Sequence, residues 1–413
     1  MYTIKVISSA SKVKGQGVGS CYEEQVRLIK GGLQGKFAVH DVHDAREARD
    51  NRDVHDVRST HDVRDTRNVH DVRDNRDVRS ACGAQGEDST SPRRPRPRAA
   101  DINHYHTIDP ANLISNLCKG HRTVSVGYVH FLPETVDGSL RMPATVRKLF
   151  NSYLILFYKS MDYLVTVNPS FVGKLEQFGV DPARIAYIPN FVSCDGFCEL
   201  GADEIAQARR SVGVGPGEFV ALGVGQLQTR KGVADFVEVA RMLPDVTFLW
   251  AGGFSFGVIT SGYEKMRELV ADPPPNVRFL GIVDRSEMNK VYNACDALFL
   301  PSYSELFPMA VLEAMCCKKP LLLRDIDAYT QILYDGYIKG KSNEDFAEAL
   351  RRLARDPAFY SEWQSRSWTC HEQYAEESVL RMWEAFYTSV LESRKTKTDG
   401  RLFAPWKNRQ ATE

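Results

Sequence analysis

The residues of this sequence best suited to carry chemistry are two glutamates eight positions apart, Glu305 and Glu313. The apolar run at 297–302, stopped by a proline, predicts a buried parallel strand, and 309–315 contains good helix formers without a breaker. We therefore expect Glu305 in a strand-to-helix loop and Glu313 inside the helix. In open α/β sheets such loops bind ligands, and a helix N-terminus favours a phosphate. Because carboxylates accept hydrogen bonds from hydroxyls, the pair suits a sugar nucleotide.

The elements around this pair alternate between strand and helix in two separate series. Predicted strands lie at 4–8, 123–130, 164–168 and 185–188, and then at 219–225, 246–251, 277–280, 297–300 and 320–323. This pattern predicts an α/β fold with two Rossmann-like domains facing across a cleft. We place the domains at 1–198 and 199–375, and expect 376–413 to form a helix that returns to the first domain and a basic tail. Considered without these elements, Glu305 and Glu313 could equally be an ordinary surface-loop glutamate and a solvent-exposed helix glutamate.

A glycine-rich segment follows the first predicted strand and precedes a helix predicted at 22–29. Its residues Gly17, Val18 and Gly19 would let backbone approach a phosphate or a sugar closely. The segment does not match the G-x-G-x-x-G pattern of dinucleotide-binding proteins, so a simple tight turn remains the alternative.

The stretch at about 40–100 interrupts the first domain. Residues 40–79 repeat His or Arg, Asp and Val with a period of three, and a segment rich in Ser, Pro and Arg follows. This period fits neither a strand nor a helix face, so we expect a disordered or weakly helical insertion. Metal binding by its His and Asp residues is the alternative, although no ligand geometry is evident.

The composition excludes several classes of protein. Lys and Arg balance Asp and Glu at 53 each, so no charge excess indicates a nucleic-acid partner. The nine cysteines include no C-x2-C pair, which argues against a zinc site and favours reduced, buried thiols. Neither a signal peptide nor a membrane-spanning run is evident. We expect a cytoplasmic protein that associates peripherally with the inner face of the cell membrane.

Taken together, the motifs resemble those of the GT-B glycosyltransferases of family 4, and more closely the bacterial diacylglycerol glucosyltransferases. The resemblance covers nearly the whole chain except about 40–100. The segments that carry it are 14–20, 104–110, 127–134, 187–193, 225–232, 252–253, 304–315 and 323–326.

The resemblance implies roles in binding the donor sugar. Glu313 matches the glutamate that binds the ribose hydroxyls. Glu305 matches the one near the transferred sugar, where the backbone N–H groups of Phe307 and Met309 assist (Pro308 has none).

Two cations are expected to stabilise the departing diphosphate. Arg230 and Lys231 match the family's positive charges at the leaving group, which is electrostatic catalysis. Many relatives carry Arg directly after the glycine that matches Gly225, where this chain has the neutral Gln226. Arg230 is therefore expected to contribute more of the positive charge that stabilises the diphosphate. Gly253 belongs to a Gly-Gly turn of the donor-binding domain.

In the first domain, His130 matches a histidine at the reacting centre. Gly17, Val18 and Gly19 match the loop that closes over the sugar and phosphate. Without the resemblance, a histidine at the end of a buried strand is more commonly a satisfied core residue.

The implied reaction is transfer of glucose from UDP-glucose to diacylglycerol with retention of configuration, giving alpha-monoglucosyldiacylglycerol. We expect a front-face route in which the leaving phosphate accepts the proton of the acceptor. No bound cofactor is expected. If Mg²⁺ has an effect, we expect it to stimulate the reaction and not to serve as a structural ion. The D-x-D at 325–327 resembles the metal motif of the other glycosyltransferase fold, but its position after the paired glutamates favours chance.

A lipid acceptor requires contact with a membrane, and the segment 141–159 mixes basic, aromatic and leucine residues. This composition is typical of a helix lying among anionic headgroups. A core-facing helix of the first domain is an equal alternative, and the tail at 394–407 would add a second basic contact. The expected membrane residues are Arg141, Arg147, Lys148, Phe150, Phe157 and Lys159.

Three other functions fit the same motifs. One is a family 4 transferase with another acceptor, such as a glycolipid, a polyisoprenoid or a soluble sugar. Another is a nucleotide-sugar epimerase of the same fold. The third is an inactive homologue in which the insertion breaks the first sheet.

Overall fold

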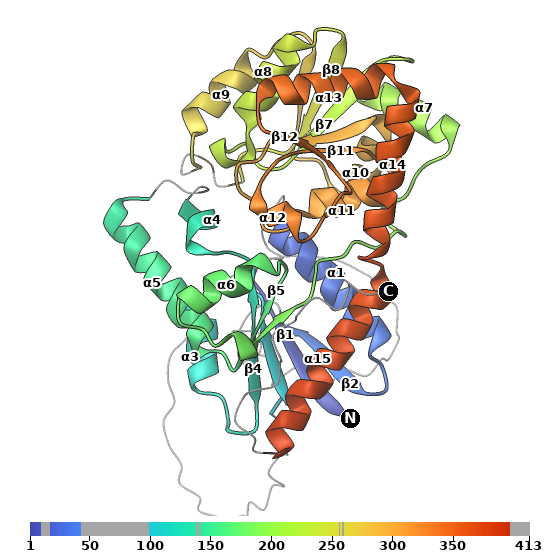
Figure 1. Cartoon of the computed structure of the whole chain (residues 1–413). Coiled ribbons are helices and arrows are strands. Elements are labelled where there is room, and N and C mark those ends of the chain that lie inside the picture. The colour runs from blue at the N-terminus through green and yellow to red at the C-terminus, as the bar shows by residue number, and fades with distance from the viewer. Residues whose placement is uncertain are drawn as a thin grey trace, which may run out of the picture.

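The computed structural model describes residues 1–9, 17–42, 99–137, 139, 142–255, 257 and 260–396 as two α/β halves, one above the other in Figure 1. Each half contains a six-stranded sheet, which confirms the predicted fold class. Arg141, the residues 43–98 that contain most of the repeat, and the tail after 396 lie outside the described residues.

The N-terminal sheet has the strand order β2-β1-β3-β4-β5-β6, and all its pairs are parallel. Its strands are β1 (Tyr2–Ile7), β2 (Phe37–Val42), β3 (Ile102–Tyr105), β4 (Val124–Val129), β5 (Tyr163–Thr166) and β6 (Ile185–Tyr187). Every residue of β4 and β5 is buried. Helices cover both faces of such a sheet, which explains why these strands read as continuous apolar runs.

The C-terminal sheet has the order β12-β11-β10-β7-β8-β9 and is also parallel throughout. Its strands are β7 (Phe219–Val224), β8 (Val246–Ala251), β9 (Val277–Gly281), β10 (Ala297–Leu300), β11 (Leu321–Arg324) and β12 (Ile338–Gly340). The interior strands β8 and β10 are fully buried, as their sequences predict.

Helices connect the strands in both halves. Those of the N-terminal half are α1 (Gly17–Gly32), α3 (Pro110–Leu117), α4 (Pro133–Asp137), α5 (Ala144–Ser160) and α6 (Ser170–Gln177). Those that follow are α7 (Ala202–Ser211), α8 (Val233–Met242), α9 (Tyr263–Ala271), α10 (Arg285–Ala294), α11 (Met309–Cys316), α12 (Asp327–Thr330), α13 (Asn343–Arg355), α14 (Pro357–Glu372) and α15 (Glu376–Thr396). The helix predicted at 22–29 thus begins earlier, because Gly17, Val18 and Gly19 form its first turn instead of a loop.

The insertion leaves the N-terminal sheet from an edge. Strand β2 pairs with β1 from Tyr2↔Phe37 to Ile7↔Val42, and β3 lies on the other side of β1. The sheet is therefore continuous from β2 to β6. This arrangement argues against the idea that the repeat breaks the sheet.

The chain crosses between the halves twice, first in the linker 188–201 and again between α14 and α15 (Figure 1). Helix α15 lies on the N-terminal half and packs against α1. There Arg27 pairs with Glu376 at 2.8 Å, and the Tyr387 hydroxyl is 2.9 Å from Nδ1 of His104. The last helix therefore fastens the two halves together.

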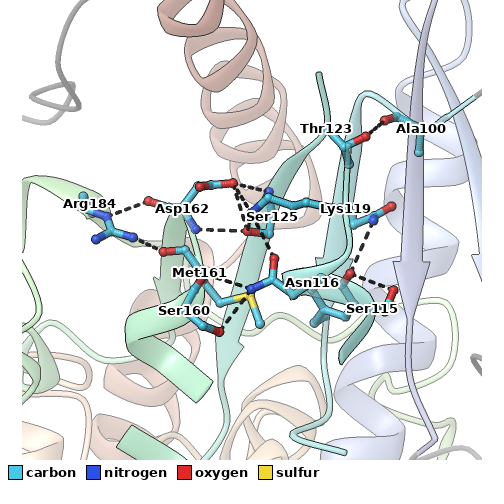
Figure 2. Close-up of polar contacts among 12 residues, drawn as sticks. Ala100, Ser115, Asn116, Lys119, Thr123, Ser125, Ser160, Met161, Asp162 and Arg184 are labelled. Atoms are coloured by element: carbon cyan, nitrogen blue, oxygen red, sulfur yellow. Dashed lines mark hydrogen bonds and ion pairs between the residues drawn. The ribbon is translucent and has the colours of Figure 1, made fainter. Parts of the chain in front are cut away.

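A polar cluster at the amino ends of β4 and β5 anchors α3 and α5 (Figure 2). Lys119 lies 2.7 Å from the Asp162 carboxylate and donates a hydrogen bond to Ser125. Asn116 of α3 donates to the carbonyl of Ser160, the last residue of α5, at 2.8 Å. Both helices are thereby held at their carboxyl ends.

Candidate active site

A cavity of about 830 Å³ lies between the carboxyl ends of the two sheets and is lined by both halves. The predicted site residues that line it are Val18, Gly19, His130, Gln226, Arg230, Lys231, Gly253, Glu305, Phe307, Pro308, Met309 and Glu313. Gly17 begins α1, one position before the lining residue Val18. The predicted residues are thus gathered in one place.

Glu305 lies at the centre of a buried charge cluster. Lys231 Nζ is 2.5 Å from its Oε1 and Arg230 Nη1 is 3.4 Å from its Oε2, while the glutamate is only 6% exposed. Burial alone would raise the pKa of Glu305, but the charges of Lys231 and Arg230 outweigh it and the pKa lies below its usual value. Burial lowers the pKa of Lys231, which the carboxylate partly offsets. Glu305 is therefore ionised at neutral pH.

The turn that carries the two cations is fixed by a glycine. Arg230 and Lys231 belong to the short 3-10 turn Thr229–Lys231, which ends at Gly232 with φ of 70°. A Cβ atom at Gly232 would lie 2.2 Å from the carbonyl oxygen of Pro301, next to the Glu305 loop. Only glycine permits this approach, so Gly232 lets the turn that carries Arg230 and Lys231 pack against the segment that leads to Glu305.

Arg230 also reaches the N-terminal half. Its Nε donates to the Ser139 hydroxyl at 3.0 Å, and its Nη1 donates to the Ser304 carbonyl at 2.5 Å. The guanidinium therefore contacts both halves at the cavity wall.

Glu313 forms a second charge cluster that sequence reasoning did not include. Arg285, at the start of α10, lies 2.5 Å from the Glu313 carboxylate and 2.8 Å from Glu24 of α1. The Tyr292 hydroxyl donates to the other Glu313 oxygen at 2.7 Å. Arg285 thus bridges the two halves beside Glu313. Arg285 follows directly after the loop that leaves β9, at the same sheet edge as Glu305, and this position was the available signal.

The glycines after β7 and β8 bring two backbone segments into contact. Gly252 has φ of 140°, and a Cβ there would lie 1.9 Å from the Gly225 carbonyl oxygen. That carbonyl accepts a hydrogen bond from the Trp250 indole at 2.9 Å. Gln226 accepts a hydrogen bond from the Gln228 amide. Its side chain therefore has a partner within its own loop.

The loop before α11 is fastened to the N-terminal half by two asparagines. Asn168 donates to the Leu306 carbonyl at 2.8 Å, and Asn190 donates to the Phe307 carbonyl at 3.1 Å. Helix α11 then begins after Pro308 without a side-chain cap. Its first N–H groups thus remain available at the cavity wall.

His130 belongs to a cluster of three buried histidines. Its Nε2 is 3.2 Å from Nδ1 of His106, whose ring lies 4.6 Å from that of His104. Burial lowers the pKa of His130 to about 3, so the imidazole is neutral at physiological pH. His130 alone of the three lines the cavity.

Apolar side chains of both halves also line the cavity, among polar residues. Those of the N-terminal half include Ile108, Phe131, Val136 and Phe150, and Leu306 joins Ile108 and Phe131 against the same hydrophobic core. Phe150 projects from α5, the helix predicted to contact a membrane. The cavity thus has a charged region around Glu305 and an apolar region beside the core of the N-terminal half, which we call its charged wall and its apolar wall.

Two of the predicted membrane residues are placed differently by the structure. Phe157 is buried in the core with Leu154 and Tyr158, and Phe150 is half-buried at the cavity. Leu154, Phe157 and Tyr158 form a stripe at i, i+3 and i+4, which packs on the sheet. The prediction was wrong for Phe157 because helix composition does not reveal which face packs inward.

The outer face of α5 is exposed, including Arg147, Lys148 and Lys159. Large apolar side chains lie on the same helix and on α3, and Leu149 and Leu117 are 73% and 69% exposed. The exposed apolar residues of the two helices are Ile114, Leu117, Val146, Leu149 and Leu156. Within the part of the chain that the structure describes, no helix combines the length and apolar character needed to span a bilayer.

Comparisons with known proteins agree with this geometry. Residues 204–367 match the family described as glycosyl transferases group 1, and residues 39–195 match glycosyltransferase family 4. The alpha-galactosylglucosyldiacylglycerol synthase of Streptococcus pneumoniae is 35% identical over 384 residues, which cover 93% of this chain and 88% of the relative. The processive diacylglycerol alpha-glucosyltransferase of Acholeplasma laidlawii is 29% identical over 62% of this chain and 76% of its own length.

Solved structures show the same fold at low sequence identity. Anabaena Alr3699/HepE in complex with UDP and glucose superposes with a TM-score of 0.67 at 14% identity, covering 94% of this chain and 100% of that chain. Sucrose-phosphate synthase from Thermosynechococcus elongatus gives a TM-score of 0.69 at 15% identity, covering 95% and 100%. With two sheets facing one cavity and a relative aligned over nearly its whole length, the chain belongs to the family 4 glycosyltransferases of the GT-B fold.

Proposed function

We propose that this glycosyltransferase moves a hexose from a nucleotide sugar to a hydroxyl of a diacylglycerol-type lipid at a membrane surface, with retention of configuration. The observation that carries the proposal is the division of one cavity into a charged wall and an apolar wall. A charged donor and a lipid acceptor differ in this same way, and each needs its own surface.

The charged wall supports donor binding. Arg230 and Lys231 would contact the diphosphate and exchange part of their pairing with Glu305 for it. The free N–H groups at the start of α11 would add to this field. Glu313, held by Arg285 and Tyr292, would accept hydrogen bonds from the ribose hydroxyls.

The mechanism follows from the charges available. Glu305 is already paired with two cations, so it is a poor nucleophile, and a front-face route is favoured. In that route the bond to the diphosphate breaks, the acceptor oxygen bonds to the same face of the anomeric carbon, and the acceptor proton passes to the leaving phosphate. Arg230 and Lys231 stabilise the departing charge. His130 is neutral, which suits a hydrogen bond to the sugar better than proton donation.

The apolar wall supports a lipid acceptor. Phe150 lines the cavity, while Leu149 on the same helix is exposed to the outside. Helix α5 lies at the periphery of the N-terminal half in Figure 1. With Arg147 and Lys148 beside Leu149, the helix would bind an anionic bilayer from the cytoplasmic side and deliver the lipid headgroup to the cavity.

Two donor and acceptor pairs are candidates. The sequence prediction, UDP-glucose with diacylglycerol, agrees with the name of the Acholeplasma relative. The name of the Streptococcus relative, which is more similar, favours addition of galactose to glucosyldiacylglycerol. Both names designate alpha products. Because UDP-hexoses are themselves alpha-linked, retention is expected for either pair.

The test is to incubate the protein with UDP-glucose or UDP-galactose and anionic vesicles that contain diacylglycerol or glucosyldiacylglycerol. Mass spectrometry identifies the lipid product and NMR its anomeric configuration, with Glu305→Gln in parallel. An alpha-linked glycolipid that the variant does not form supports the proposal. Epimerised nucleotide sugar without a lipid product would instead indicate an isomerase. Transfer of the sugar only to water would contradict the proposal that the acceptor is a lipid.

A further inference from the structure

Three side chains outside the cavity place soft ligand atoms close together at the junction of the two halves. Cys194 Sγ lies 3.4 Å from Cys316 Sγ and 3.5 Å from Nε2 of His371. Cys316 Sγ and His371 Nε2 are 3.1 Å apart. Among the described residues, these form a group whose ligand atoms all lie within 4.8 Å of one another.

The spacing of these atoms resembles one face of a tetrahedral metal site. With zinc–sulfur bonds of about 2.3 Å and zinc–nitrogen bonds of about 2.0 Å, two sulfurs are separated by about 3.8 Å. A sulfur and a nitrogen are then separated by about 3.5 Å. The observed separations differ from these by a few tenths of an ångström, which side-chain rotation can supply without moving the backbone.

We propose that Cys194, Cys316 and His371 bind a Zn²⁺ ion, with a solvent water in the fourth position. Two thiolates and a neutral imidazole balance the charge of the ion. This donor set selects a borderline or soft metal such as Zn²⁺ over Mg²⁺ or Ca²⁺, which prefer oxygen ligands.

The surroundings of the three ligands fit a partly open site. Cys316 and His371 are buried, which fixes their positions, whereas Cys194 is exposed and leaves an entry path and room for a water. The Trp368 ring stacks on His371 at 5.0 Å with an interplanar angle of 18°. This contact orients the imidazole, as neighbouring groups commonly do for metal-binding histidines.

The ligands come from both places where the chain crosses between the halves. Cys194 belongs to the linker 188–201, and His371 lies in the last turn of α14, just before the chain turns into α15. Cys316 ends α11, three residues after Glu313. A bound ion would therefore tie both crossings to the helix that carries a donor-site glutamate, and it would stabilise the folded protein in proportion to its affinity.

Sequence spacing did not reveal this group. Cys194 and Cys198 lie four residues apart and attract notice, but the partners of Cys194 stand 122 and 177 residues away in the chain. Cys198 instead contacts Asn289. Only the packing of the linker on α11 and α14 brings the ligands together.

The test is anaerobic titration of the reduced, metal-free, full-length protein with Co²⁺ and then Zn²⁺. We expect one equivalent of Co²⁺ to give the visible bands of tetrahedral cobalt together with sulfur-to-cobalt charge transfer, and Zn²⁺ to displace it. Cys194→Ser leaves Cys316 as the one thiolate, so it should weaken the charge-transfer band and weaken binding at least tenfold, and His371→Gln should weaken binding. Cys118→Ser, which alters an exposed thiol elsewhere, is the matched control.

The charge-transfer band separates this site from the His- and Asp-rich repeat, which would bind Co²⁺ without sulfur. Zn²⁺ should also raise the Tm of the wild type and the control, but not that of Cys194→Ser. The proposal is overturned if no charge transfer appears, if Cys194→Ser binds as tightly as the wild type, or if the two cysteines form a disulfide and bind no metal when reduced.

Discussion

Two helices that border the same cavity, α11 and α5, differ in almost every respect. All eight residues of α11 are buried, and its Glu313 is held by Arg285 and Tyr292. Helix α5 instead exposes its first turns, including Leu149 and Lys148, and buries only its carboxyl-terminal part. The first helix is surrounded by protein that fixes a charge, whereas the second presents a surface to its environment.

This difference indicates how two similar α/β halves could bind a charged donor and a lipid acceptor. Both halves use a six-stranded parallel sheet, so the sheets themselves do not decide what is bound. The loops after β7 and β10 supply charges in the C-terminal half, whereas α5 supplies apolar surface in the N-terminal half. The division of labour therefore lies in the connections, as is usual for α/β enzymes.

The charged wall is tested most severely at Lys231. Lys231→Met removes a cation that we propose contacts the leaving group, and it leaves Glu305 buried with one partner fewer. We expect the rate of transfer to fall by about 10²–10³-fold, as for loss of one electrostatic contact in other active sites. Lys290→Met, which alters an exposed ion pair of α10, should leave the rate unchanged. Equal loss in both variants would show a general effect of charge instead of a local one.

The N-terminal half should be the part that acid weakens, because its three buried histidines are held neutral. Burial, with the charge of His130, lowers the pKa of His104 to about 3, against about 6.5 in the unfolded chain. Between these values the unfolded state binds more protons, so the free energy of unfolding falls as the pH falls. Well below pH 6.5 His104 alone should contribute about 1.4 kcal/mol per pH unit, which amounts to about 2 kcal/mol between pH 7 and 5.

Urea unfolding at pH 7, 6 and 5 measures this slope. His104→Phe should have a shallower pH dependence than the wild type by that amount. Tyr387→Phe removes the same hydrogen bond but keeps the histidine, so it should lower stability without changing the slope. An unchanged slope in His104→Phe would show that His104 does not stay neutral in the fold.

The exposed face of α5 should give the smallest effect. Leu149→Ser removes an apolar side chain that would enter the headgroup region, and we expect binding to anionic vesicles to weaken about fivefold, or about 1 kcal/mol. Met242→Ser changes a partly exposed apolar residue of α8 in the other half. Sedimentation with vesicles should show unchanged binding for Met242→Ser. If both variants lost vesicle binding equally, α5 would not be the surface that contacts the membrane.

Much of the fold could be predicted because its signals are local. The strands are continuous apolar runs, and the paired glutamates follow one of them directly. The partners of those glutamates could not be predicted from spacing, since Lys231 lies 74 residues before Glu305 and Glu24 lies 261 residues before Arg285. Such pairs exist only after the two halves dock.

The errors have equally physical causes. Phe157 was assigned to the membrane because basic and aromatic residues share its helix, but the stripe formed with Leu154 and Tyr158 faces the core. The exposed Leu149 and Leu117 were not singled out, because the outer face of a helix is defined only once its inner face has packed.

The most direct test of the two-wall account is to measure the dissociation constant of UDP and the rate of lipid glycosylation for Lys231→Met and Phe150→Ser. The account predicts that Lys231→Met weakens UDP binding and slows transfer. It predicts that Phe150→Ser binds UDP as the wild type does but transfers sugar to the lipid more slowly. If Phe150→Ser weakened UDP binding as much as Lys231→Met, or left lipid transfer unchanged, the cavity would not be divided between donor and acceptor.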